Sequence, residues 1–163
     1  MDVHPQLIDV VAGLLTELAD GPADVAYVLN RGDRGLLASL RSLSAERASA
    51  RPAGRSSIAS HVHHLQYALS LINRWARGED LFGQADWSES WRHHQVTEEE
   101  WTALVEALES EIRTWLRAIA TLRQLDTAGL RETIGSIIHL AYHLGAIRQV
   151  DAAAAGPPAS SPG

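Results

Sequence analysis

The apolar residues of this chain recur at intervals of three and four over long stretches, and this spacing limits the fold more than any other feature. The segment from Ser57 to about Arg77 shows it most clearly. Its apolar stripe consists of Ile58, Val62, Leu65, Leu69 and Ile72. Residues at this spacing share one face of an α-helix, and no segment shows the alternation typical of a β-strand. The sequence therefore predicts an all-α fold.

The same periodicity predicts further helices, and terminal signals delimit them. Their approximate ranges are 5–19, 34–43, 97–122 and 130–150. Gly21 and Pro22 end the first of them. Thr97 and Glu100 match a capping box at the start of the third. Four long amphipathic helices with one extra short helical segment indicate a four-helix bundle.

The chain has 163 residues, which suffices for one domain with its own core. Residues 1–151 are expected to form this single domain. Segment 152–163 is rich in alanine, proline and serine and is expected to be a flexible C-terminal tail. Segment 79–96 lacks helical spacing, and connections of this length often pack over a functional site. Its Trp87 and Trp91 are expected to be core anchors or the cover of a pocket.

Composition excludes several classes of function. The chain has no cysteine, so disulfides, thiolate metal ligands and a cysteine nucleophile are excluded. The formal net charge is −6, and the 14 basic side chains, all arginine, are dispersed, which argues against a nucleic-acid partner. No apolar run is long enough to span a bilayer, and the start MDVHPQLIDV lacks the features of a signal peptide. We expect a cytoplasmic protein without a membrane partner.

Histidines form the most informative pattern, because most of the eight lie in clusters. On a helix, His139 and His143 project from one face about 5–6 Å apart, which is the geometry with which two imidazoles hold one metal ion. Apolar neighbours indicate that this helix is buried, and buried imidazoles need a partner. Leu140 stands where a zincin motif has its glutamate, so no protease-like general base follows His139.

A third ligand is expected from a neighbouring helix. His64 is the preferred candidate, with His61, one turn earlier, as second choice, whereas His63 points toward solvent or an interface. The alternative is that the histidine pair is only structural. His93 and His94 lie in a polar stretch and are expected to belong to a solvated loop, and His4 is expected to be incidental.

Two motifs resemble those of the DinB/YfiT-like superfamily. The segment SIASHVHHL, residues 57–65, is similar to its second-helix motif, and HLAYHLGAIR, residues 139–148, is similar to its last-helix motif H-x-x-x-H-R-G-Q-I. The resemblance implies a four-helix bundle, often a homodimer, with a metal held by three histidines. By position these are His64, His139 and His143. Leu144 and Ala146 replace the usual arginine and glutamine, so the ligand positions are kept and the polar residues beside them are not.

Family members include transferases of low-molecular-weight thiols such as bacillithiol or mycothiol, an isomerase that uses such a thiol, and many proteins without known activity. Three imidazoles leave a coordination position open and suit zinc, nickel, copper or iron, among which the sequence does not choose; nickel and zinc are our first expectation. We therefore expect one divalent metal ion and metal-activated transfer of a thiol to a small electrophile. The alternatives are a metal-dependent hydrolase, a non-catalytic metal-binding or ligand-binding bundle, and a structural dimer with degenerate histidines.

Other polar residues are weaker candidates for the site. Three acids that follow the helix of His64 are expected to reach a pocket mouth, and three further residues are expected as polar contacts. These are Glu79, Asp80 and Asp86, and Asn73, Arg74 and Arg148.

Overall fold

The computed structural model of the chain describes residues 5–79, 83, 85–122 and 126–157. Within these ranges the regular secondary structure is helical and contains no strand, which confirms the predicted all-α class. The long helices are α1 (Pro5–Asp20), α4 (Ile58–Ala76), α5 (Glu98–Thr121) and α6 (Thr127–Val150). The shorter ones are α2 (Gly35–Arg41) and α3 (Ala45–Ser49), with 3-10 turns η1 (Pro52–Gly54), η3 (Glu89–Trp91) and η4 (Ala152–Ala154).

Side-chain caps explain where the helices begin. Thr97 Oγ1 accepts a hydrogen bond from the backbone N–H of Glu100, and the Glu100 carboxylate accepts one from the N–H of Thr97, so the predicted capping box is present. Helix α6 begins at Thr127, three residues before the expected start. The reason is Asp126, whose carboxylate accepts a hydrogen bond of 2.7 Å from the N–H of Gly129.

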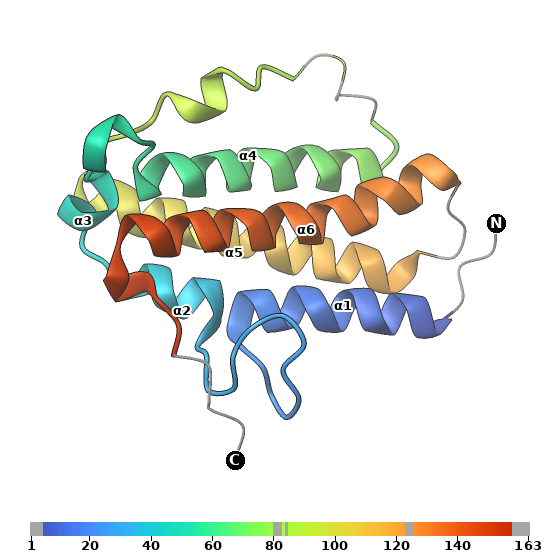
Figure 1. The fold of residues 1–163 in the computed structure, drawn as a ribbon. Helices are drawn as coiled ribbons and strands as arrows, with labels where there is room; N and C mark the ends of the chain where they lie inside the picture. The colour runs from blue at the N-terminus through green and yellow to red at the C-terminus, as the bar shows by residue number, and fades with distance from the viewer. Residues whose placement is uncertain (1–4, 80–82, 84, 123–125, 158–163) are drawn as a thin grey trace.

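The four long helices lie alongside one another, as Figure 1 shows. Helices α1 and α4 each contact both α5 and α6, so the contacts close into a ring. The apolar stripes face the inside of this ring and form the core. Its largest fully buried side chains include Leu15, Leu18, Leu65, Leu108, Trp115 and Leu140. No helix in the described ranges is both long and apolar enough to cross a membrane.

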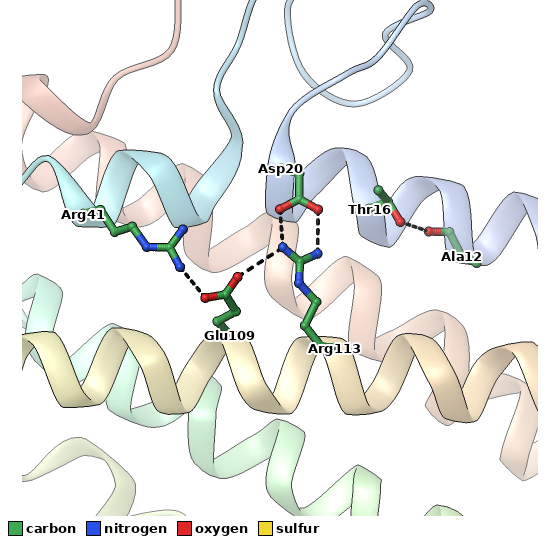
Figure 2. Close-up of polar contacts among 6 residues, drawn as sticks. All are labelled: Ala12, Thr16, Asp20, Arg41, Glu109 and Arg113. Carbon is green, nitrogen blue, oxygen red and sulfur yellow. Dashed lines mark hydrogen bonds and ion pairs between the residues drawn. The ribbon is translucent and has the colours of Figure 1, made fainter.

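An ion-pair cluster, Asp20, Arg41, Glu109 and Arg113, joins α1, α2 and α5 at the surface (Figure 2). Arg113 donates to both carboxylate oxygens of Asp20 at 2.6 Å each. Glu109 accepts from Arg113 at 3.2 Å and also from Arg41. Each acid in the cluster thus has an arginine partner, and the two pairs of opposite charges balance.

Two segments outside the long helices pack against them. Residues 85–97, the described part of the connection that leads to α5, run along the outer side of α4, where η3 contacts that helix (Figure 1). Beyond α6, Ala154 of η4 is completely buried, and Asn30 donates a hydrogen bond to the carbonyl of Pro157. Packed chain therefore continues through residue 157, past the expected domain boundary at 151, and residues 158–163 lie outside the described ranges.

Candidate metal centre

Three histidines meet where α4 crosses the middle of α6. His64 lies on α4, and His139 and His143 lie one turn apart on α6. The Nε2 atom of His139 is 3.1 Å from Nε2 of His64 and 2.9 Å from Nε2 of His143. One ring nitrogen from each residue lies within 4.8 Å of those of the other two. His64 is 6% and His143 2% exposed, and His139 is half-buried. This arrangement can hold a metal ion.

A serine in the α4–α5 connection determines the tautomer of His64. The Ser90 hydroxyl donates its hydrogen to the carbonyl of Trp87 at 2.7 Å and contacts Nδ1 of His64 at 2.8 Å. A hydroxyl has one hydrogen, and that of Ser90 is used in the bond to Trp87. In the contact with His64, Nδ1 of His64 is therefore the donor and the Ser90 oxygen the acceptor. The Nε2 atom of neutral His64 therefore turns a lone pair toward His139. A metal-binding histidine is commonly oriented by such a second hydrogen bond.

His61 contacts the second ring nitrogen of His143, as Ser90 contacts that of His64. Its Nδ1 lies 2.9 Å from Nδ1 of His143, on the side of that ring that faces away from His139. A hydrogen on Nδ1 of His143 would bond to His61 and leave Nε2 of His143 as a ligand atom. His61, the second choice for the third ligand, thus contacts the histidine trio from outside and is not part of it.

The neutral rings cannot satisfy both Nε2–Nε2 contacts with well-directed hydrogen bonds. His64 offers a lone pair, and an N–H of His139 points along only one of its two contacts. One cation between the three nitrogens removes this deficit. The distances also suit such an ion, since two imidazoles bound tetrahedrally at about 2.0–2.1 Å have nitrogens about 3.3 Å apart. The donor set and its spacing therefore fit a divalent transition metal.

Electrostatics keep the rings neutral and ready to act as ligands. Burial, reinforced by the neighbouring histidines His139, His61 and His63, lowers the pKa of His64 to about 4. Burial and the same kind of repulsion lower the pKa of His143 to about 3. Burial also lowers the pKa values of His61 and His139. At neutral pH the centre thus offers lone pairs and no positive charge of its own.

Two tryptophans of the α4–α5 connection cover the centre. The Trp91 ring stacks on His64 with 4.3 Å between centroids and an interplanar angle of 22°. It also meets His61 edge-on at 5.2 Å. Trp87 lies 5.9 Å from the His64 ring and packs edge-on against Tyr67. Of the two expected roles for these tryptophans, the structure therefore supports the cover of a site.

A cavity of about 180 Å³ adjoins the centre. His139 forms part of its wall, and Trp87 lies at its edge. Most of the remaining wall comes from aliphatic side chains of α4 and from small or aliphatic residues of α6. A group bound in this cavity would therefore contact a candidate metal ligand directly.

The other predicted site residues lie elsewhere. His63 bonds to the backbone carbonyl of Ser90 at 3.0 Å, and its ring lies tilted against that of His93 with 4.2 Å between centroids, rather than pointing to solvent. His93 is exposed as expected, whereas His94 is half-buried. His4 lies outside the described residues.

The described polar candidates are engaged with other side chains or with the backbone. Arg74 pairs with Glu79 at 2.9 Å. The five described candidates do not line the cavity beside His139, and Asp80 lies outside the described residues. The bonds of the remaining three are as follows: Asn73 donates to Glu111, Arg148 pairs with Asp33, and Asp86 caps the turn at Ser88 and Glu89.

Sequence reasoning missed Ser90. No spacing rule connects it to His64, because the contact depends on the path of the connection back over α4. The pattern Trp87-Ser-Glu-Ser-Trp91 carries the available signal, since two tryptophans in a polar stretch indicate that the segment packs against something. The polar residues between them then become candidates for buried contacts.

Comparisons with protein-family models, with curated proteins and with solved structures find no match to this chain.

Proposed function

We propose that this chain is a DinB-like four-helix bundle that binds one divalent metal ion, nickel or zinc, at His64, His139 and His143. We propose further that it transfers a low-molecular-weight thiol, of the bacillithiol or mycothiol type, to small electrophiles. The observation that carries the proposal is the convergence of three neutral Nε2 atoms beside a cavity. The ring of contacts among the four long helices supports the bundle.

A divalent metal ion held by the three imidazoles would lower the pKa of a thiol or water bound to it. The residues of this chain orient and shield the imidazoles. Ser90 and His61 fix the rings of His64 and His143 through their second nitrogens. Trp91, stacked on His64, keeps water from one face of the ligand. Because the chain has no cysteine, the thiol must come from solution.

In the proposed reaction the thiol loses its proton to solvent and its sulfur forms a bond to the electrophilic carbon. The leaving group departs with the electron pair of the bond that breaks. A thiol and a halide-bearing electrophile thus yield a thioether, a halide ion and a proton. In the alternative of a metal-dependent hydrolase, water replaces the thiol. In a non-catalytic bundle the metal would bind without turnover.

A homodimer is part of the proposal. Ile134, Ile138 and Tyr142 form an exposed apolar stripe at i, i+4 and i+8 along α6, and Ile138 and Tyr142 are 63% and 69% exposed. An exposed stripe of this kind is typical of an interaction surface. Sedimentation velocity should find a dimer that Ile138→Glu dissociates. A monomeric wild-type chain at micromolar concentration would contradict this part.

The catalytic part is tested with metal-loaded protein, bacillithiol or mycothiol, and monochlorobimane, whose thioether product fluoresces. We expect turnover in wild type and in the matched control His93→Ala, which removes an exposed histidine. His64→Ala should reduce turnover to the uncatalysed rate. Equal turnover in His64→Ala and wild type would disprove the catalytic role. Metal binding without thiol transfer, together with ester hydrolysis, would favour the hydrolase instead.

A further inference from the structure

The cavity beside His139 is elongated along α4 and α6, which run antiparallel to each other (Figure 1). On α6 its wall runs from His139 through Ser136 and Gly135 to Glu132, two turns away. Seven helical residues span about 10 Å. The cavity therefore has a metal end at His139 and a far end at Glu132.

Aliphatic side chains of α4 form the opposite wall. They repeat at one face of the helix and comprise Leu65, Ala68, Leu69 and Ile72. Ala68 and Gly135 are the small residues of the two walls. A Cβ atom added to Gly135 would meet nothing within 4 Å, so open space lies beside it. Small residues that face each other between two helices leave room for a ligand.

The polar groups of the wall offer few bonds to a ligand. Ser136 Oγ already donates to the Thr133 carbonyl and accepts from Trp115 Nε1 at 2.9 Å. Glu132 is exposed, and no ion pair joins it to another described residue. Its negative charge at the far end disfavours an anionic group there. The cavity is thus suited to apolar, uncharged groups.

Its volume indicates which groups fit inside it. A cavity of about 150 Å³ with aliphatic walls is large enough to bind benzene. The volume of about 180 Å³ found here therefore accommodates a phenyl ring or a branched alkyl group of similar size. A sugar-bearing thiol is too large and too polar for it.

We infer that this cavity binds a compact, uncharged apolar group of the substrate, with the reactive atom at the His139 end and the apolar body directed toward Ile72 and Glu132. The inference rests on the proposed metal centre and assigns the cavity to the electrophile rather than to the thiol. Ala68 and Gly135 keep the cavity open, and Glu132 selects against anionic substituents at the far end.

Two hydroxamates test the assignment, because both present the same metal-binding group but only benzohydroxamate carries a phenyl ring. In metal-loaded wild type, calorimetry should find benzohydroxamate bound at least about tenfold more tightly than acetohydroxamate, since its ring leaves water. Ala68→Phe, which fills the cavity, should remove this advantage, so that the two hydroxamates bind with similar affinity. The matched control Ala103→Phe, on the exposed face of α5, should keep the advantage.

Equal affinities of the two hydroxamates in wild type would overturn the inference, and so would an undiminished advantage in Ala68→Phe. If Ala68→Phe does not fold, Gly135→Leu replaces it, because the space beside Gly135 admits a side chain. A carboxylate in the para position of the ring should weaken binding about threefold, and Glu132→Gln should relieve this loss. An equal loss in both proteins would contradict the role of Glu132.

Toluene separates failure of the inference from failure of the metal centre. Ligand-observed NMR should detect toluene bound to metal-free wild type but not to metal-free Ala68→Phe. If no hydroxamate binds while toluene does, the metal centre fails and the apolar cavity stands. If toluene does not bind to wild type, the cavity assignment fails whatever the metal content.

Discussion

The histidine trio between α4 and α6 and the ion-pair cluster that joins α1, α2 and α5 both contain several polar side chains in contact. In the ion-pair cluster of Figure 2, Arg113 and Arg41 face Asp20 and Glu109, so opposite charges satisfy one another. In the trio, the Nε2 atom of His139 lies 3.1 Å from Nε2 of His64 and 2.9 Å from Nε2 of His143, and the rings are neutral. The first group is neutralised by its own charges, whereas the second brings together neutral nitrogen atoms that can act as metal ligands.

The two groups also differ in their contact with water. The arginines and acids of the ion-pair cluster keep contact with water, which screens their attraction. Trp91 shields one face of His64. Burial lowers the pKa values of His64 and His143, so these two rings do not take up protons at neutral pH. A largely buried cluster that resists protonation is suited to a metal ion, and an exposed cluster of paired charges is suited to holding helices together.

The largest expected effect is the loss of metal-dependent stability in His143→Ala. A metal ion at a hundred times its dissociation constant adds about 2.7 kcal/mol to the free energy of unfolding. In a chain of this length that raises Tm by about 5–10 °C. Thermal melts with and without a chelator should show this difference in wild type and in His93→Ala, and none in His143→Ala. An equal chelator effect in all three proteins would remove His143 from the centre.

Acid should destabilise the metal-free protein through His64 and His143 of the trio. In the unfolded chain His64 and His143 protonate near pH 6.5, but in the folded chain their pKa values fall to about 4 and about 3. Between pH 6.5 and 4 the unfolded state therefore binds more protons, and the free energy of unfolding decreases as the pH is lowered. The slope is at most about 1.4 kcal/mol per pH unit for each histidine.

Urea unfolding at a series of pH values measures this slope. The double variant His64→Gln/His143→Gln provides the reference, because it retains the carboxylates that also titrate in acid. Wild type should lose stability more steeply than the double variant below pH 6.5. Parallel profiles would show that the two imidazoles titrate alike in the folded and unfolded chains.

Ser90→Ala should have a smaller effect, on the affinity for metal. It removes the oxygen that accepts from Nδ1 of His64 and leaves the ligands in place. Loss of such a partner lowers metal affinity about 10–100-fold. Competition with a chromophoric chelator measures it, with Ser88→Ala, an exposed serine of the same connection, as the control. An unchanged affinity in Ser90→Ala would mean that the hydroxyl does not orient His64.

The smallest effect is expected in the ion-pair cluster. Arg113→Gln should lower the free energy of unfolding by about 1 kcal/mol or less, because the pairs are partly exposed. Salt should reduce the difference further. Metal affinity should stay at the wild-type value. A weaker metal affinity in this variant would mean that the two clusters are coupled through α5.

Local sequence signals predicted the parts of the structure that depend on neighbours along the chain. The spacing of Ile58 to Ile72 located α4, the Thr97–Glu100 box located the start of α5, and the separation of His139 and His143 located the half of the site on α6. Contacts made across the fold were not predictable in this way. The bond from His64 to Ser90 depends on how the α4–α5 connection folds back.

The choice between His64 and His61 illustrates the same limit. The two residues lie three positions apart on α4, and helical spacing alone puts them on similar faces. Their separate roles follow from the crossing with α6, which brings Nε2 of His64 to His139 and Nδ1 of His61 to His143. The packing of 152–157 against the core is likewise a long-range contact that a composition of small residues does not reveal.

Elemental analysis of protein purified without added metal tests the central claim most directly. The account predicts close to one divalent transition-metal ion per chain in wild type and in His93→Ala, and none in His64→Ala or His143→Ala. A wild-type protein that contains no stoichiometric metal, takes none up from nickel or zinc solutions, and melts at the same temperature with and without a chelator would contradict it.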